Sequence, residues 1–376
     1  MLRNIFFQLH KWFGLVVGLV IFVISITGCI YVFHDELKLI CYPQKYFLET
    51  KVETVFKPLS FTELRTIAQK SLPEGESITR ADIYPAKNRT WVFRAQKTDE
   101  DAIGHVQYQK YYKRVFINPY TGEVQAVENT KYEFFQIVLQ LHLNLLLGKK
   151  IGHPIVGIST ILFIILLLSG IVIWFPKKRT KKSFKRSFLI KWKSKWKRLI
   201  YDFHNVLGFY SLFFALILGI TGLVFAYPNF KKAYAEFFNF GPKSSISLSE
   251  KPFWMNTHVL ENPLDDLIQN VLERHASADM MSVRLKANNQ KQDVQVRLDK
   301  DKTSQFYWYY ADLQKTEIDS IKSNQNLQIG DKLVAMNYDM HVGSIGGIPT
   351  KILIFIISFI CASLPVTGFI VWWNKR

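Results

Sequence analysis

Four of the nine histidines in this chain fall in stretches that repeat within the sequence, and the repeat sorts them into pairs. The first pair is His10, in Leu-His-Lys-Trp-Phe-Gly, and His204, in Phe-His-Asn-Val-Leu-Gly. A Thr-Gly follows each at the same distance, so that Gly28 and Gly222 lie 18 residues beyond their histidines. Imidazole is the commonest metal-binding side chain in proteins.

The second pair is His142 and His341, and a small hydroxyl residue and a glycine follow these histidines too. Gly170 lies 28 residues beyond His142, and Gly368 lies 27 residues beyond His341. The chain therefore consists of two copies of one unit, with one histidine at the entrance of each apolar stretch. Two imidazoles from different helices can bind one haem iron from opposite faces, which gives a low-spin centre suited to electron transfer. The four histidines are candidate axial ligands of two haems.

The elements that must position these histidines are four apolar runs, each about as long as the roughly 20 residues that cross a bilayer. The hydrophobic content of 49% and the aromatic content of 15% are high for a soluble protein. None of the runs carries an aspartate or glutamate in its interior. We expect an integral membrane protein whose spans are roughly Trp12–Phe33, Pro154–Phe175, Val206–Tyr227 and Ile348–Trp373.

The net charge of +18 is concentrated in a way that indicates membrane topology. Twelve Lys or Arg and no acidic residue lie between Lys177 and Arg198, directly after the second run. Such a segment is typical of a cytoplasmic loop, and its aromatic residues favour contact with anionic lipid over binding of nucleic acid. An even number of spans then places both termini in the cytoplasm and the polar segments, about 35–150 and 229–345, outside the bacterial inner membrane.

This topology puts His10 and His204 at the cytoplasmic side and His142 and His341 at the periplasmic side. Glycines one turn deeper on the same helix faces, Gly14 and Gly208, would leave room for a flat macrocycle. Eighteen residues make five helical turns, about 27 Å, so Gly28 and Gly222 are expected near the level of the opposite haem. Gly170 and Gly368 have the same relation to the cytoplasmic haem.

Other readings of the histidines stay open. The four could bind copper or zinc, although no Cys, Met or carboxylate is matched at corresponding places. His153 is a rival to His142 as a ligand. His34 could be a spare ligand or a group beside substrate or a propionate, but an exposed interfacial position is the expectation.

The two external segments share one order of elements. A helix whose Ser60 and Glu63 form a capping box runs to about Leu72, and strands are expected at 78–84, 90–96 and 108–118, closed by a turn at Pro119–Glu123. The second segment has a helix at about 263–275 and strands near 281–287, 293–298 and 305–312. The segment that corresponds to the turn, Asp312–Glu317, lacks the glycine. Amphipathic stretches at 132–147 and 331–341 lead into the second and fourth spans.

These segments carry a resemblance to a known family. The helix and three strands that end in Ile-Asn-Pro-Tyr-Thr-Gly-Glu (117–123) resemble a PepSY domain, and the stretches from His142 to Trp174 and from His341 to Trp373 resemble the PepSY-associated transmembrane family. The resemblance implies a two-haem inner-membrane ferric-siderophore reductase, an oxidoreductase of iron uptake. The missing turn glycine leaves open whether the second module is mainly structural.

The expected fold is thus a membrane all-α four-helix bundle of two pseudo-repeated helix pairs, with two periplasmic α+β PepSY-like modules. The expected divisions are 1–34 (cytoplasmic start and first transmembrane helix), 35–130 (first module), 131–175 (interfacial helix and second transmembrane helix), 176–203 (basic cytoplasmic loop), 204–228 (third transmembrane helix), 229–330 (second module) and 331–376 (interfacial segment and fourth transmembrane helix).

The expected activity is electron transfer through two b-type haems to a periplasmic ferric siderophore. The sequence has no Rossmann-type glycine fingerprint, so the electrons must come from quinol or from another protein. No catalytic residue can be assigned. One alternative is a haem-free membrane anchor that displays PepSY modules for regulation or interaction. Another is a transporter, which the lack of buried acidic pairs and broken helices disfavours.

Overall fold

The computed structural model describes residues 2–48, 57–176, 180–239, 262–286 and 291–374. Four of its helices are long and apolar enough to cross a membrane: α1 (Leu2–Val32), α7 (Gly152–Trp174), α9 (Trp196–Ala226) and α14 (Ile348–Trp373). The four expected spans are confirmed as helices, but α1 and α9 each begin ten residues earlier than expected. Parts of the basic and terminal segments, 177–179 and 375–376, lie outside the described residues.

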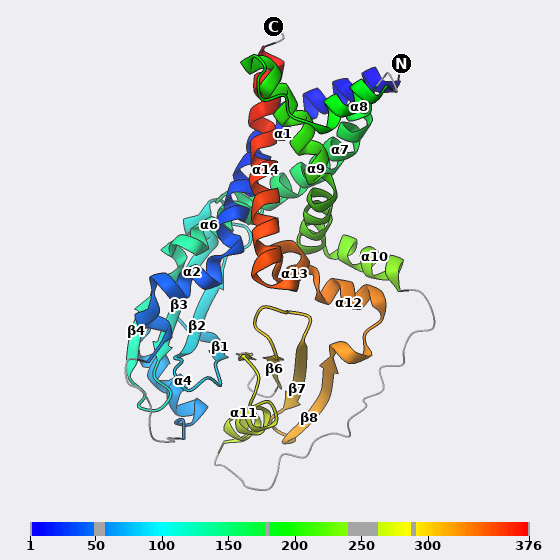
Figure 1. Cartoon of the computed structure of the whole chain (residues 1–376). Coiled ribbons are helices and arrows are strands. Elements are labelled where there is room, and N and C mark those ends of the chain that lie inside the picture. The colour runs from blue at the N-terminus through cyan, green and yellow to red at the C-terminus, as the bar shows by residue number, and fades with distance from the viewer. Residues whose placement is uncertain (1, 49–56, 177–179, 240–261, 287–290, 375–376) are drawn as a thin grey trace.

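The four long helices pack in a ring. Helix α1 contacts α7 and α14, and α9 contacts the same two helices. Both chain ends and the short basic helix α8 (Lys181–Phe188) lie at one end of this helical core, and a sheet lies beyond the other end (Figure 1). Large apolar side chains are exposed on all four long helices, for example Leu19, Ile165, Phe213 and Phe359, as a lipid-facing surface requires.

Each external segment folds as a helix and four strands, one strand more than expected. In the first module, α4 (Phe61–Lys70) precedes β1 (Ile78–Ile83), β2 (Trp91–Thr98), β3 (Gln109–Ile117) and β4 (Val124–Glu128). In the second, α11 (Pro263–Arg274) precedes β5 (Met280–Arg284), β6 (Lys291–Arg297), β7 (Phe306–Asp312) and β8 (Glu317–Ser323). Ser60 is confirmed as the N-cap of α4, because its side chain accepts a hydrogen bond from the Glu63 amide at 3.2 Å.

The turn after the third strand is a hairpin in both modules, and it needs a residue with positive φ. Gly122 supplies it at +74° in the first module. A Cβ at Gly122 would come within 2.8 Å of the Ile67 side chain. Thr316 takes the equivalent place in the second module at +52°. The second hairpin therefore keeps its geometry without glycine, at a cost that left-handed backbone imposes on a β-branched residue.

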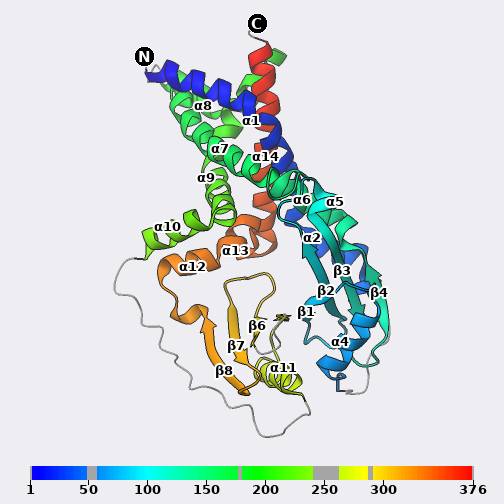
Figure 2. The same ribbon diagram turned by 180° about the vertical axis from the view of Figure 1, so that it is seen from behind.

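The two modules are not separate sheets. Strand β1 pairs with β5 in antiparallel register, with Ala81 opposite Val283, and joins them into one eight-stranded antiparallel sheet in the order β4-β3-β2-β1-β5-β6-β7-β8. Figure 2 shows the two halves from behind. This pairing joins residues about 200 positions apart and was not expected from the sequence.

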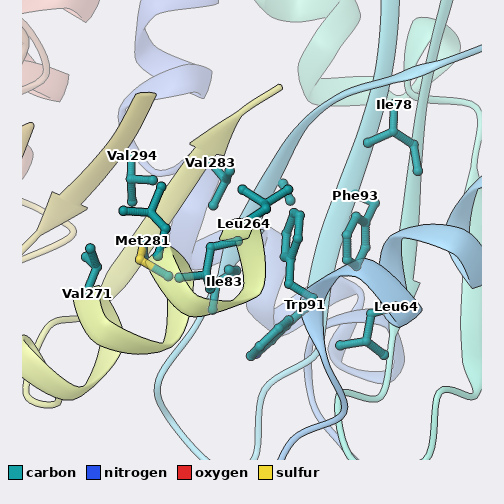
Figure 3. Close-up of a cluster of buried hydrophobic side chains, with 14 of the residues drawn as sticks. Leu64, Ile78, Ile83, Trp91, Phe93, Leu264, Val271, Met281, Val283 and Val294 are labelled. Atoms are coloured by element: carbon teal, nitrogen blue, oxygen red, sulfur yellow. The ribbon is translucent and has the colours of Figure 1, made fainter. Parts of the chain in front are cut away.

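One face of the sheet carries the hydrophobic core. Helices α4 and α11 cover it, with Leu64 and Leu267 fully buried against inward residues of the strands such as Phe93 and Val283. Figure 3 shows this cluster running across both modules. Because successive residues of a strand point to opposite faces, the other face carries a second set of side chains, and it is turned toward the helical core.

Short helices connect the sheet to the long helices. Two of them bear candidate ligands: α6, which replaces the expected stretch 132–147, and α13, which follows α12 in the stretch 331–341. The connecting elements are α2 (His34–Cys41), α3 (Pro43–Tyr46), α5 (His105–Tyr108), α6 (Phe134–Asn144), α10 (Pro228–Phe238), α12 (Ile329–Ala335), α13 (Asn337–Val342) and the 3₁₀ turns Thr130–Tyr132, Asn324–Asn326 and Ser344–Gly346.

Candidate functional site

The structure brings the four repeat histidines together in two pairs. His10 on α1 faces His204 on α9, with ring centroids 6.1 Å apart and ring planes at 88°. His142 on α6 faces His341 on α13, with centroids also 6.1 Å apart and planes at 72°. We call the first the terminal-side pair, since it lies toward the chain ends, and the second the sheet-side pair.

The separation of the rings fits two imidazoles that share one metal ion. Each metal–nitrogen bond is about 2 Å long and each ring centre lies about 1 Å behind its nitrogen, so the two centres fall about 6 Å apart. A direct nitrogen-to-nitrogen hydrogen bond would bring the centres to about 5 Å. Edge-to-face ring packing occurs at 6 Å too, but it leaves two ring nitrogens without partners in an apolar interior.

Hydrogen bonds fix which nitrogen of the terminal-side pair is free. Nδ1 of His10 lies 3.1 Å from the Leu166 carbonyl and 3.0 Å from the Ser169 hydroxyl. Nδ1 of His204 lies 3.1 Å from the Leu364 carbonyl and 3.0 Å from the hydroxyl of Thr367. A carbonyl only accepts, so each Nδ1 carries the proton. Nε2 is left with its lone pair for a metal, the arrangement that metal-ligating histidines almost always have.

The sheet-side pair repeats this pattern. Nδ1 of His142 donates to the Ile24 carbonyl at 2.8 Å, with the Thr27 hydroxyl at 3.3 Å. Nδ1 of His341 lies 2.8 Å from the hydroxyl of Thr221, which itself donates to a backbone carbonyl of α9. Burial lowers the pKa of both His142 and His341. Both rings are therefore neutral, as an iron ligand must be.

A glycine lies beside each ring. A Cβ at Gly170 would stand 3.4 Å from Cε1 of His10, and one at Gly368 would stand 3.1 Å from Cε1 of His204. On the sheet side, the distances to Cε1 are 3.4 Å from Gly28 to His142 and 3.8 Å from Gly222 to His341. Each ring therefore packs on the backbone of a neighbouring helix, at the level expected from the five-turn spacing.

The glycines one turn from the terminal-side histidines lie differently. A Cβ at Gly14 would contact the Leu166 side chain at 3.8 Å, and one at Gly208 would contact Leu364 at 3.6 Å. They thus allow the close approach of α7 and α14, whose Leu166 and Leu364 carbonyls accept the Nδ1 protons. The structure puts leucine side chains beside them rather than a histidine ring.

The hydroxyl partners of Nδ1 were missed from the sequence, although a signal for them exists. Each stands directly before a ring-packing glycine, as Thr27-Gly28, Ser169-Gly170, Thr221-Gly222 and Thr367-Gly368. The dipeptide supplies an acceptor for the ring nitrogen and a gap for the ring in consecutive residues.

A haem and a metal held by side chains alone need different numbers of protein ligands. Across the described residues, no three or more His, Cys, Asp or Glu side chains come together in a way that could hold a metal ion. Protein-bound zinc and copper need three or four such ligands. A haem iron already has four porphyrin nitrogens and needs only two axial ligands, which is what each pair offers.

A cavity of about 860 Å³ lies between the sheet and the sheet-side pair. Helix α6 lines it with Gln136 and Leu139, one to two turns before His142. Helix α13 lines it with Asn337 and Tyr338, one turn before His341. The cavity is therefore within about two helical turns of both rings. It was not foreseen from the sequence, because its lining comes from strands of both modules.

Two further histidines have settled positions. His34 is buried and lines this cavity, stacked on Tyr31 with centroids 3.9 Å apart, so the expectation of an exposed interfacial position is wrong. Its Nε2 lies 3.2 Å from the Asp35 carboxylate. His153 packs edge-on against Tyr227, at 5.9 Å. The ring that faces His341 is His142, not His153.

Contacts of α13 hold His341 in place. The Asp339 carboxylate accepts hydrogen bonds from the amide and the hydroxyl of Thr303, both at 2.8 Å, and so ties α13 to the loop between β6 and β7. The Asn337 side chain donates to the Thr221 carbonyl at 3.1 Å. The sheet, α13 and α9 therefore meet at the sheet-side pair.

Comparison with known proteins agrees with this architecture over almost the whole chain. The model of the PepSY-associated TM region matches residues 7–375, a stretch that includes all four paired histidines and the eight strands. No curated protein matches the chain. Since the family model spans nearly its full length, the chain belongs to the PepSY-associated transmembrane family.

Proposed function

We propose that this protein is a di-haem electron-transfer protein of the bacterial inner membrane, an oxidoreductase that reduces a ferric siderophore in the periplasm. The observation that carries the proposal is the repeated geometry of the histidine pairs. Both have ring centroids 6.1 Å apart, and in both Nδ1 is hydrogen-bonded while Nε2 has no hydrogen bond among the described residues.

The orientation follows from charge. Helix α8 and its flanking segment are rich in Lys and Arg and lie with the chain ends (Figure 1). The positive-inside rule assigns that end to the cytoplasm. The four-helix bundle then holds the terminal-side pair near the cytoplasmic surface. The PepSY-like modules stand in the periplasm, with the sheet-side pair beneath them.

The side chains of this protein do four things in the proposal. His10 and His204 would hold one haem, and His142 and His341 the other. The Ser and Thr hydroxyls and the backbone carbonyls keep each Nδ1 protonated and so keep Nε2 free. When bound, the haems supply two one-electron stations, one near each surface. The electron donor is a quinol or a protein partner at the cytoplasmic or membrane side.

The haem-free anchor is the competing function. It would leave the Nε2 atoms of the four paired imidazoles without a hydrogen-bond partner among the described residues, and it gives their repeated pairing no role. In an anchor, the four Ser/Thr-Gly dipeptides would serve helix packing alone.

The visible spectrum of the full-length protein, purified in detergent from haem-replete cells, tests the proposal. A low-spin b-type spectrum that changes on dithionite addition, with about two haems per chain, is the expected result. A colourless protein would reject the di-haem proposal and favour the haem-free anchor. Anaerobic mixing of the reduced protein with an iron(III) chelate should then reoxidise the haems, and the absence of reoxidation by any iron(III) chelate would reject the reductase activity.

A further inference from the structure

The face of the sheet that looks toward the membrane helices is basic in both modules. In β1 and β2, Arg80 and Arg94 alternate with core residues, and Arg114 does so in β3. Strands β5 and β6 repeat the pattern with Arg284 and Arg297. All five line the 860 Å³ cavity described above, so both modules contribute to its wall.

Acidic side chains do not balance this charge. The described residues that line the cavity include six arginines and four lysines, against three aspartates. Three acids behind the lining, Glu128, Glu133 and Asp301, pair with Arg114, Lys38 and Lys300, and an excess of four positive charges remains. Among the described residues, Arg89, Arg284 and Arg297 have no carboxylate within ion-pair distance. A concave site with one sign of charge and low-dielectric walls concentrates counter-ions of the opposite sign.

Aromatic rings hold several of the arginines in place. The Arg89 guanidinium lies 4.2 Å from the Tyr84 ring centroid, and the Arg284 guanidinium lies 4.6 Å from that of Trp308. A stacked guanidinium keeps its N–H edge available for hydrogen bonds to carboxylate or other anionic oxygens. The donors are therefore preorganised before a ligand arrives.

The cluster also has more donors than acceptors. The buried Nε atoms of Arg94, Arg114 and Arg297 have no hydrogen-bond partner among the described residues. These three nitrogens are inaccessible to solvent, so they add to the electrostatic preference for an anion without contacting it.

We propose that the cavity binds a polyanionic iron(III) chelate, one that presents carboxylate or catecholate oxygens, and excludes cationic chelates such as those of linear trihydroxamates. This rests on the proposed function and narrows its substrate class. The volume suits such a ligand, since cavities of about 300–1,000 Å³ hold drug-sized molecules. The position suits it as well, because the cavity reaches α6 and α13 within about two turns of the sheet-side histidines.

Gallium(III) complexes test this without electron transfer, since gallium(III) is not reduced under these conditions. Full-length protein in detergent is titrated by calorimetry with gallium tris-catecholate, gallium citrate and the cationic gallium complex of desferrioxamine B. Both anionic complexes should bind, with affinity that falls steeply as salt is raised, and the cationic complex should bind at least about tenfold more weakly. Equal binding of the cationic complex would overturn the proposal.

The matched variants are Arg297→Gln and, outside the cavity, Lys110→Gln. Arg297 has no carboxylate partner among the described residues, so its loss leaves no acid unpaired, whereas Lys110 is half exposed and pairs with Asp99. Arg297→Gln should weaken binding of gallium tris-catecholate about tenfold, and Lys110→Gln should leave it unchanged. Equal effects of the two changes would reject the site. If Arg297→Gln fails to fold, the salt dependence of gallium tris-catecholate binding to the parent protein tests the site instead, and binding that does not change with salt would reject it.

The two proposals can fail separately. Haem content is measured on the same samples, so a haem-free protein that binds anionic gallium complexes would reject only the electron-transfer function. A two-haem protein that binds no anionic complex would reject only the substrate class.

Discussion

Phe225 packs edge-on against His341, with ring centroids 5.5 Å apart, and also lines the cavity. Its side chain is half exposed in the described structure, on the wall between the sheet-side pair and the proposed substrate. Phe225 therefore contacts the ring of His341 and also forms part of the cavity wall.

Replacing Phe225 should separate haem binding from reduction of the chelate. Phe225→Leu keeps an apolar side chain but removes the ring, so the haem spectrum should stay as in the parent. Reoxidation of the reduced haems by an anionic iron(III) chelate, followed by stopped flow, should slow severalfold. Phe213→Leu, at an exposed position of the same helix, is the control. Equal reoxidation rates in the parent and in Phe225→Leu would show that Phe225 takes no part in electron transfer to the chelate.

The pairing of the histidines predicts which haem each substitution removes. His10→Ala and His204→Ala should each abolish the terminal-side centre and leave about one haem per chain. His142→Ala and His341→Ala should abolish the other centre. The check is a redox titration monitored by optical spectroscopy, in which the two members of a pair lose the same component. Loss of different components within one pair would mean that the pairs are wrongly assigned.

The glycines predict a graded effect. A Cβ at position 368 would stand 3.1 Å from His204, which is tighter than ordinary contact, whereas one at position 222 would stand 3.8 Å from His341. Overpacking costs about 1–3 kcal/mol, so Gly368→Ala should weaken haem retention on the terminal side by about tenfold or more. Gly222→Ala should have little effect on the sheet side. Haem loss to apomyoglobin measures both, and the reverse order would contradict the packing described.

The ion pairs of Asp82 predict how the stability of the sheet depends on pH. Burial alone would raise the pKa of Asp82, but Arg94, Arg80 and the Ser282 hydroxyl outweigh it and lower the pKa to about 2. A carboxylate with a depressed pKa stabilises the fold above its unfolded pKa, near 4, and loses this contribution as pH falls toward 2. The contribution near neutral pH is about 2 kcal/mol.

The test compares the parent with Asp82→Asn in detergent by thermal unfolding from pH 7 to pH 3. The variant should be less stable at pH 7, and its difference from the parent should shrink below pH 4, where the parent begins to lose the carboxylate. Ser320→Ala, on β8, serves as a control for substitution within the sheet. A difference that stays constant with pH would show that the charge of Asp82 does not act through its ion pairs.

Much of this arrangement could be predicted from the sequence, because it rests on short-range patterns. The apolar runs fix the four long helices, and the 18-residue spacing from His10 to Gly28 fixes the helix face on which both lie. The two modules could be predicted from the capping residue Ser60 and from the alternation of apolar and polar residues in their strands.

The rest depends on contacts that no local pattern encodes. Strands β4 and β8 are partly polar, so their sequences did not identify them as the edge strands of a sheet. The pairing of β1 with β5 joins two strands that could each have ended a sheet, and the cavity exists only because of it. In the sequence, the arginines are the polar residues that alternate with apolar residues along each strand. This alternation is the same whether the polar face of the sheet contacts water or a ligand.

The pairing of β1 with β5 has a geometric consequence for the whole chain. Equivalent strands of the two repeats, β1 and β5, pair in antiparallel register with Ala81 opposite Val283, as an approximate two-fold relation between the repeats requires. Each histidine pair likewise takes one histidine from each repeat. The interface between the repeats is thus isologous, like that of a homodimer, but both halves are one polypeptide. A true homodimer would have to carry identical residues on both sides; here Asp82 on one half can correspond to Arg284 on the other, and a symmetric scaffold can hold an asymmetric ligand in one orientation.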